Sequence, residues 1–303
     1  KDYFAPLLPG QVCAVIAQTS HYKSGFLHFI EHQAAVQLQK ENRLDEILVH
    51  ISVEEGVEEQ SFLEFARETG DDPGKIARGQ VQDWTKLQAA MVKVGAIPIF
   101  RIGESLARAE ESPNLYMSNM IRAIQHLGEH SEKFLTFKPK IAGLFFDYLQ
   151  AFPIDPEHKS AERMDQRRLQ VRSDIYRLRQ AANYFNCPVF VAVQAKQHLD
   201  GANEPIMLPG VYDGEESSSI AQRCDRVITL WMPARTHTIG ATISTQGMNF
   251  TVDPNLLFIK VAKQRGGLPA GKIFKCRINF ERNLITTETR PEMPGRHVDI
   301  AQL

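Results

Sequence analysis

The segment from Gln18 to Ser24 has residue types and a spacing that suit the binding of phosphate groups. It follows an apolar run and precedes an amphipathic stretch, so a strand, a short loop, a Lys–Ser pair and a helix are expected in that order. In loops of this layout, backbone N–H groups and the helix N-terminus hold phosphate oxygens, lysine neutralises charge and serine binds Mg²⁺. The candidate nucleotide-contacting residues are Ser20, His21, Tyr22, Lys23 and Ser24, and Ser24 is also a candidate Mg²⁺ ligand.

The loop departs from the strict pattern G-x-x-x-x-G-K-[ST] at both glycine positions, which Ala17 and Tyr22 occupy. Glycine allows the backbone to pass close to the phosphates in torsions that a side chain resists. A non-glycine residue in such a conformation costs roughly 1–3 kcal/mol. Tyr22 therefore predicts either a weakened or lost nucleotide site, or a rearranged loop whose ring folds outward or stacks on the base. Taken alone, the Lys–Ser pair fits an exposed helix start better than a nucleotide site.

Three further polar residues follow apolar runs and are expected at strand ends, where open α/β sheets bind ligands. Glu54 could deprotonate a water for attack on a γ-phosphate, or it could simply favour a helix start through the helix dipole. Asp147 could hold Mg²⁺ or its waters, or it could be a hydrogen-bonded cap. Gln194 could sense the γ-phosphate, although alone it would indicate nothing.

Short apolar runs alternate with amphipathic segments along the chain, which is typical of a parallel sheet covered by helices. We expect strands at residues 12–17, 46–51, 97–101, 141–147, 188–193, 226–231, 256–262 and 272–280, and helices at 23–40, 57–69, 81–94, 114–130 and 160–185. The glycine-rich stretch 266–271 predicts a hairpin between the last two strands. Residues 196–218 are expected to be an irregular loop, and 285–303 a loose end. No repeat or linker divides the chain, so residues 1–290 are predicted to be a single domain and 291–303 a loose C-terminal tail.

The composition fits a globular protein and excludes other classes. The chain has 303 residues, 43% of them hydrophobic, which suffices for the core of one large domain. The net charge of −1 gives no global positive field, so any DNA binding must depend on local clusters. No apolar run reaches the roughly 18 residues of a membrane span, and no signal peptide is seen. A cytoplasmic protein without a membrane partner is expected.

The four cysteines are Cys13, Cys187, Cys224 and Cys276. None of them forms a CxxC pair, so the cysteines predict no zinc site. Three lie in or beside apolar stretches, which predicts buried free thiols in a reducing compartment.

Taken together, the segments resemble the motor domain of DnaB-type replicative helicases, from about Pro9 to Thr287. Several motifs occur in the family's order and at the expected strand ends, which makes chance a poor explanation. They are Pro9-Gly10 before the first strand, Ser52-Val53-Glu54, Gly79 with Gln82-Asp83-Trp84 and Leu87, Phe146-Asp147-Tyr148-Leu149-Gln150, Val193-Gln194, Ile220-Ala221-Gln222 with Asp225, and Val261-Ala262-Lys263-Gln264-Arg265-Gly266-Gly267.

The resemblance implies an α/β fold of the RecA-like P-loop NTPase type that uses ATP and Mg²⁺. Glu54 would be the catalytic base, Asp147 would position Mg²⁺, and Gln194 would link the nucleotide to a DNA-facing loop that contains Lys196. Lys263 and Arg265 would reach into the site of a neighbouring subunit and stabilise the transition state. The implied partners are single-stranded DNA, further copies in a ring-shaped homo-oligomer such as a hexamer, and a primase or helicase loader.

Three functional hypotheses stay open from the sequence. A helicase or translocase motor is supported by the preserved Glu54, Asp147 and Gln194, together with Lys263 and Arg265. A non-hydrolysing DNA-binding or assembly scaffold with a degenerate nucleotide site is supported by Ala17 and Tyr22. A RecA-like ATPase used in signalling or regulation is compatible with the nearly neutral charge. Glu215, which replaces an arginine usual in the family near DNA, also casts doubt on conventional translocation.

Overall fold

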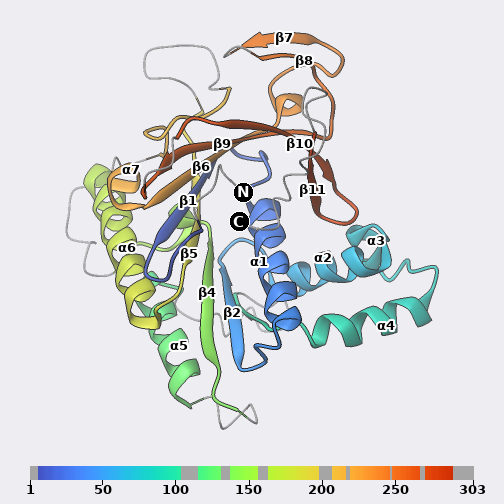
Figure 1. Ribbon diagram of the computed structural model, residues 1–303, viewed down its shortest axis with the longest axis vertical. Coiled ribbons are helices and arrows are strands. Elements are labelled where there is room, and N and C mark those ends of the chain that lie inside the picture. Colours follow the sequence, from blue (N-terminus) through green and yellow to red (C-terminus); the bar gives the residue numbers. More distant parts are fainter. Residues whose placement is uncertain are drawn as a thin grey trace.

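A computed structural model describes residues 6–103, 115–130, 137–155, 163–197, 207–215, 219–245, 248–266 and 270–288. Its centre is a nine-stranded sheet in the order β11-β10-β9-β6-β1-β5-β4-β2-β3 (Figure 1). The strands from β6 to β3 in this order run parallel, whereas β9, β10 and β11 extend the sheet in antiparallel fashion. The predicted α/β fold with a mostly parallel sheet and a C-terminal hairpin is therefore confirmed.

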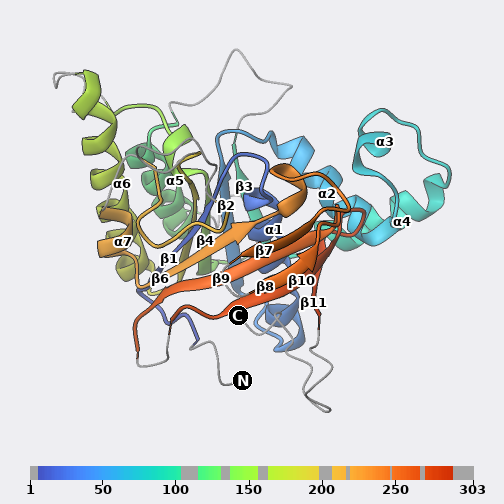
Figure 2. The same cartoon turned by 90° about the horizontal axis from the view of Figure 1, so that it is seen from above.

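The strands of this sheet are β1 Val12–Ala17, β2 Glu46–Ser52, β3 Ile99–Ile102, β4 Lys140–Asp147, β5 Val189–Gln194, β6 Arg226–Trp231, β9 Leu256–Gln264, β10 Ile273–Asn279 and β11 Leu284–Thr287. The α-helices are α1 Lys23–Lys40, α2 Val57–Thr69, α3 Pro73–Ala77, α4 Trp84–Gly95, α5 Met117–His130, α6 Arg163–Phe185 and α7 Ser219–Arg223. The helices α5, α6 and α7 cover one face of the sheet, and α1 lies against the other (Figures 1 and 2).

The central strand β1 is buried on both faces, which explains its unbroken apolar run. Alternate residues point to opposite sides of a strand. Val12, Ala14 and Ile16 pack in the core beneath α5 and α6, whereas Cys13 and Val15 pack in the core beneath α1. The loop after β1 therefore leaves the sheet at its middle and leads into α1.

The structure corrects several predicted elements. Residues 285–303 are not loose throughout, because β11 pairs with β10 and buries Ile285; the predicted tail, residues 291–303, lies outside the described residues. The third strand is β3, Ile99–Ile102, rather than 97–101. Helix α3, which begins where the Asp72 side chain accepts a hydrogen bond from the backbone of Lys75, was not predicted.

The hairpin of β7, Thr242–Thr245, and β8, Met248–Thr251, was also not predicted. It is held by a small aromatic cluster, because Phe250 packs against Trp231 and Phe258.

All four cysteines are buried free thiols. None of the described helices is long and apolar enough to cross a membrane.

Candidate nucleotide-binding site

The carboxyl ends of four neighbouring parallel strands meet at one edge of the sheet. The register pairs Ala17 of β1 with Gln194 of β5, and Ser52 of β2 with Asp147 of β4. Strand β5 lies between β1 and β4, so these ends form a continuous row. The loop that leads to Lys23 begins at one end of this row, and Glu54 follows the other. The residues that the sequence singled out at strand ends are thus brought together.

Lys23 is turned inward over this row of strand ends. Its side chain is 9% exposed, so the interpretation of an exposed helix start is wrong for this residue. Its Nζ donates to Oε1 of Gln194 at 2.8 Å and to the carbonyl oxygen of Gln18 at 3.4 Å. Burial lowers the pKa of Lys23, while the carboxylates of Asp147 and Glu54 oppose this shift. The ammonium group therefore lies between the loop of residues 18–22, here called the P-loop, and the acidic residues Asp147 and Glu54.

Tyr22 takes the left-handed conformation that glycine would favour, with φ 70° and ψ 28° at the start of α1. Its ring folds away against the turn between β10 and β11. The hydroxyl donates to Oδ1 of Asn283, and the ring packs edge-on against Phe280 at a centroid distance of 5.7 Å. A side chain at Gly25 would clash, because its Cβ would lie 2.4 Å from the Tyr22 ring. Gly25 therefore provides the space that the tyrosine needs.

Two other residues of the loop were predicted to contact nucleotide. His21 is 3% exposed, and its Nδ1 accepts a hydrogen bond from the backbone N–H of Met232 at 3.0 Å. Burial, together with the positive charges of Lys23 and Arg235, lowers the pKa of His21 to about 4. The ring is therefore neutral near pH 7 and offers phosphate no positive charge. Ser20 is exposed and takes a left-handed conformation with φ 64°.

Asp147 has the properties of a carboxylate that binds a metal ion. It is fully buried, and neither carboxyl oxygen has a hydrogen-bond partner within the described part of the chain. Burial raises the pKa of Asp147, whereas the neighbouring Ser24 hydroxyl opposes the shift. A buried carboxylate with only a neighbouring hydroxyl beside it is costly unless a further group binds it. Asp147 and Ser24 therefore fit a Mg²⁺ ion, which prefers oxygen ligands.

Glu54 follows β2 and is exposed, so its carboxylate is accessible from solvent. The Ser52 hydroxyl accepts hydrogen bonds from the backbone N–H groups of Glu54 at 3.3 Å and Glu55 at 2.9 Å, which fixes the turn. Partial burial and then the charge of Asp147 raise the pKa of Glu54, with Lys23 opposing them. A raised pKa makes the carboxylate a stronger base.

The P-loop is hydrogen-bonded directly to the loop that follows β5. Nε2 of Gln18 donates to the carbonyl oxygens of Gln197 at 3.0 Å and Lys196 at 3.3 Å. Nε2 of Gln194 donates to Oγ1 of Thr19 at 2.8 Å. The sequence did not single out Gln18 or Thr19. No signal in the sequence alone could identify them, because both contacts join segments that are distant along the chain.

The loop predicted to hold DNA is described only in part. The backbone N–H of Lys196 donates to the carbonyl oxygen of Asp213 at 2.9 Å, and Ala195 forms an isolated bridge with Gly214. Gln150 braces the same region, because its Nε2 donates to the carbonyl oxygen of Glu215 at 3.3 Å. Residues 198–206 and 216–218 lie outside the described residues. The DNA-binding role of Lys196 stays a prediction.

Lys263 and Arg265 lie at the opposite edge of the sheet. Strand β9 is antiparallel to β6, so Lys263 pairs with Val227 near the beginning of β6. Lys263 Nζ donates to the carbonyl oxygens of Ala221 at 2.5 Å and Cys224 at 2.7 Å, and Arg265 Nη1 contacts Asp225 at 3.1 Å. Strands rise about 3.3 Å per residue, so the length of β1 separates this edge from the P-loop by roughly 17 Å. Neither side chain can serve the nucleotide site of its own chain.

The comparisons with known proteins identify a family and a fold. The family model for the DnaB-like helicase C-terminal domain matches residues 2–288. A solved structure described as an ATPase domain matches with a TM-score of 0.65 and 17% identity, over 92% of this chain and 84% of that chain. The structure of a DnaB-like replicative helicase and its interactions with primase matches with the same TM-score and identity.

The latter match covers 92% of this chain but 57% of that chain, so this chain spans little more than half of that helicase. No curated protein matches the sequence. The two structural matches support the fold, and the family model extends over nearly the whole chain. The chain therefore belongs to the DnaB-like helicase C-terminal domain family.

Proposed function

We propose that this chain is an ATP-driven motor domain that translocates along single-stranded DNA. The observation that carries the proposal is the direct link between the P-loop and the loop after β5, through Lys23 with Gln194 and Gln18 with Gln197. A change at the phosphate site must disturb these hydrogen bonds. The disturbance would pass to the loop that contains Lys196, where DNA phosphates are expected to bind.

The residues present fit the binding of ATP with Mg²⁺. Lys23 would neutralise phosphate charge, and Ser24 and Asp147 would hold the metal ion. Bound Mg²⁺ neutralises the charge that develops on the phosphates during transfer. Glu54 would orient the attacking water and accept its proton. A bound phosphate would attract Lys23 and break its hydrogen bond to Gln194. The freed glutamine would then change its contacts according to whether nucleotide is bound.

The position of Lys263 and Arg265 supports assembly into a ring. These residues cannot reach their own P-loop, so a catalytic role requires a head-to-tail interface with a second copy. A ring such as a hexamer provides that interface at every site. One matching structure is described as a helicase that interacts with primase, and a primase or a helicase loader is the partner we propose for the assembled form.

A second candidate function is a non-hydrolysing DNA-binding or assembly scaffold. Tyr22 favours it, because this side chain stands where the P-loop pattern has a glycine. Its ring is anchored to Asn283 and Phe280 and therefore holds the loop in place. In such a scaffold the hydrogen bonds of Lys23 to Gln194 and Gln18 would be permanent, and DNA binding would not depend on nucleotide.

The two functions are separated by the rate of ATP hydrolysis measured with and without single-stranded DNA at fixed salt. For the motor, we expect turnover that single-stranded DNA stimulates and DNA affinity that changes with bound nucleotide. DNA binding without hydrolysis and without any effect of nucleotide would instead establish the scaffold. Hydrolysis that ignores DNA would contradict both functions and would favour a regulatory ATPase.

A further inference from the structure

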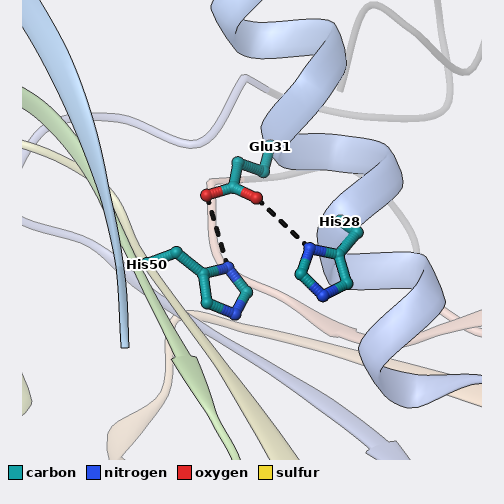
Figure 3. Close-up of side chains that lie close together, drawn as sticks. All are labelled: His28, Glu31 and His50. Atoms are coloured by element: carbon teal, nitrogen blue, oxygen red, sulfur yellow. Dashed lines mark hydrogen bonds and ion pairs between the residues drawn. The ribbon is translucent and has the colours of Figure 1, made fainter. Parts of the chain in front are cut away.

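Three ionisable side chains meet in the interior between α1 and β2, where no function has been assigned (Figure 3). His28 and Glu31 lie one turn apart on α1, and His50 lies on β2; all three side chains are 0% exposed. Both imidazole rings face the carboxylate of Glu31. Nδ1 of His28 lies 3.4 Å from one oxygen of Glu31, and Nδ1 of His50 lies 3.3 Å from the other.

The cluster leaves buried polar atoms unsatisfied. Neither ring nitrogen of His50 has a hydrogen-bond partner within the described part of the chain, and neither has Oε1 of Glu31, because their contact lacks hydrogen-bond geometry. Buried polar atoms are almost always paired, and an exception calls for an explanation such as a bound ion. Nδ1 of His50 and Oε1 of Glu31 are therefore the two atoms of the cluster that a bound ion would satisfy.

The donor set and its spacing suit zinc. Two histidines and one glutamate are an established zinc ligand set, and bonds of about 2.0–2.1 Å at tetrahedral angles place donor atoms roughly 3.3–3.4 Å apart. The candidate ligand atoms of the three residues lie within 4.8 Å of one another, and the 3.4 Å and 3.3 Å contacts are made to different oxygens of Glu31, so the side chains must move slightly for one ion to bind all three. Nε2 of His28 also contacts Oε2 of Glu55 at 3.0 Å. A carboxylate on the far nitrogen is the usual way in which a metal-bound histidine is oriented.

We propose that His28, Glu31 and His50 bind one Zn²⁺ ion that joins the P-loop helix α1 to strand β2. Imidazole nitrogens select Zn²⁺ over Mg²⁺, so this site is distinct from the oxygen ligands Ser24 and Asp147. The two rings are stacked at 4.6 Å with planes 5° apart. Because the nitrogen lone pair lies in the ring plane, at least one ring turns when the ion binds. A ring that carries a proton on its ligating nitrogen releases it when the ion binds, as is general for metal sites.

The ion would brace the two elements that carry the proposed catalytic groups. Helix α1 begins at Lys23, and β2 leads through Ser52 to Glu54. Glu55, which directly follows Glu54, contacts His28 and so connects the cluster to the proposed base. The site would thus fix the distance between the phosphate-binding lysine and the base, and it would do so without contacting nucleotide.

A surface histidine pair must be excluded in the test. His126 and His130 are exposed and lie one turn apart on α5, with ring centroids 4.5 Å apart, and could bind Zn²⁺ adventitiously. The chelator-treated, nucleotide-free full chain is titrated with Zn²⁺ against a competing chelator, and with Co²⁺ for its visible absorption. The variants are His50→Phe and Glu31→Gln, and the matched control is His126→Asn. Circular dichroism and thermal unfolding check that each variant is folded.

We expect one Zn²⁺ per chain in the wild type and in His126→Asn, with a tetrahedral Co²⁺ spectrum. Loss of a group that only orients a ligand costs about 10–100-fold in affinity, so His50→Phe and Glu31→Gln should weaken binding by more than about 100-fold. Glu31→Gln tests the site if His50→Phe does not fold. Absence of Zn²⁺ binding by the wild type, unchanged affinity in both cluster variants, or loss of binding in His126→Asn would overturn the proposal.

Discussion

The Glu54→Gln variant is expected to bind ATP with Mg²⁺ as the wild type does and to lose turnover by about 10²–10⁴-fold, the usual contribution of a general base. The change removes the proton acceptor but retains the size of the side chain. Glu54 follows the end of β2 and is exposed, so no packing is lost. The measurement is single-turnover hydrolysis at saturating ATP, compared with equilibrium binding of a nucleotide analogue.

The matched control for this prediction is Glu41→Gln. Glu41 is exposed and directly follows the C-terminal end of α1, far from the P-loop at its N-terminal end. It should leave both hydrolysis and binding unchanged. If Glu54→Gln hydrolyses ATP at the rate of the wild type, another group activates the water and the assignment of the base is wrong. Equal losses of binding and hydrolysis would show that Glu54 positions the nucleotide and is not the base.

The Arg265→Ala variant is expected to lose turnover only in the assembled state, by about 10³–10⁵-fold if Arg265 acts as an arginine finger. Arg265 is about half exposed and lies at the sheet edge opposite the P-loop. Its removal leaves Asp225 bonded to Arg179 and to the backbone N–H of Val12, so the fold should persist. Hydrolysis is measured across a range of protein concentrations that spans assembly.

Mixing two inactive variants gives a sharper test of action between subunits. A chain with Arg265→Ala keeps Glu54, and a chain with Glu54→Gln keeps Arg265. In an equal random mixture, roughly a quarter of the head-to-tail interfaces combine the two intact groups. Partial recovery of turnover on mixing is expected. No recovery in assemblies that are shown to be mixed would contradict the role of Arg265 between subunits.

The sequence predicted the centre of this fold well because its signals are local. β1 and α1 have the predicted bounds, Val12–Ala17 and Lys23–Lys40. β1 is buried on both faces and so has no polar interruption. Asp147 was identified because it ends a buried strand within a specific motif. Parallel strands then place their carboxyl ends at one edge, which is why Lys23, Asp147 and Gln194 could be grouped before the structure was known.

The remaining features depend on contacts between distant residues. The position of the Tyr22 ring is set by its hydrogen bond to Asn283, which is 261 positions away, and by the absence of a side chain at Gly25. Prediction of the cluster of His28, Glu31 and His50 would require knowledge of which face of α1 packs against β2. The hairpin of β7 and β8 has only four residues in each strand, and it packs through Phe250 against Trp231, a contact that the local sequence does not reveal.

The proposed motor function depends most on whether a P-loop with Tyr22 still binds nucleotide. The direct measurement is a titration of a fluorescent ATP analogue with Mg²⁺ against the wild type, Lys23→Ala and, as the control, Lys40→Ala at the exposed far end of α1. We predict a Kd of about 1–10 µM for the wild type and Lys40→Ala, and a loss of about 100-fold or more for Lys23→Ala, equivalent to about 2.7 kcal/mol. No binding by the wild type up to millimolar nucleotide, or equal binding by Lys23→Ala, would contradict the proposed motor function.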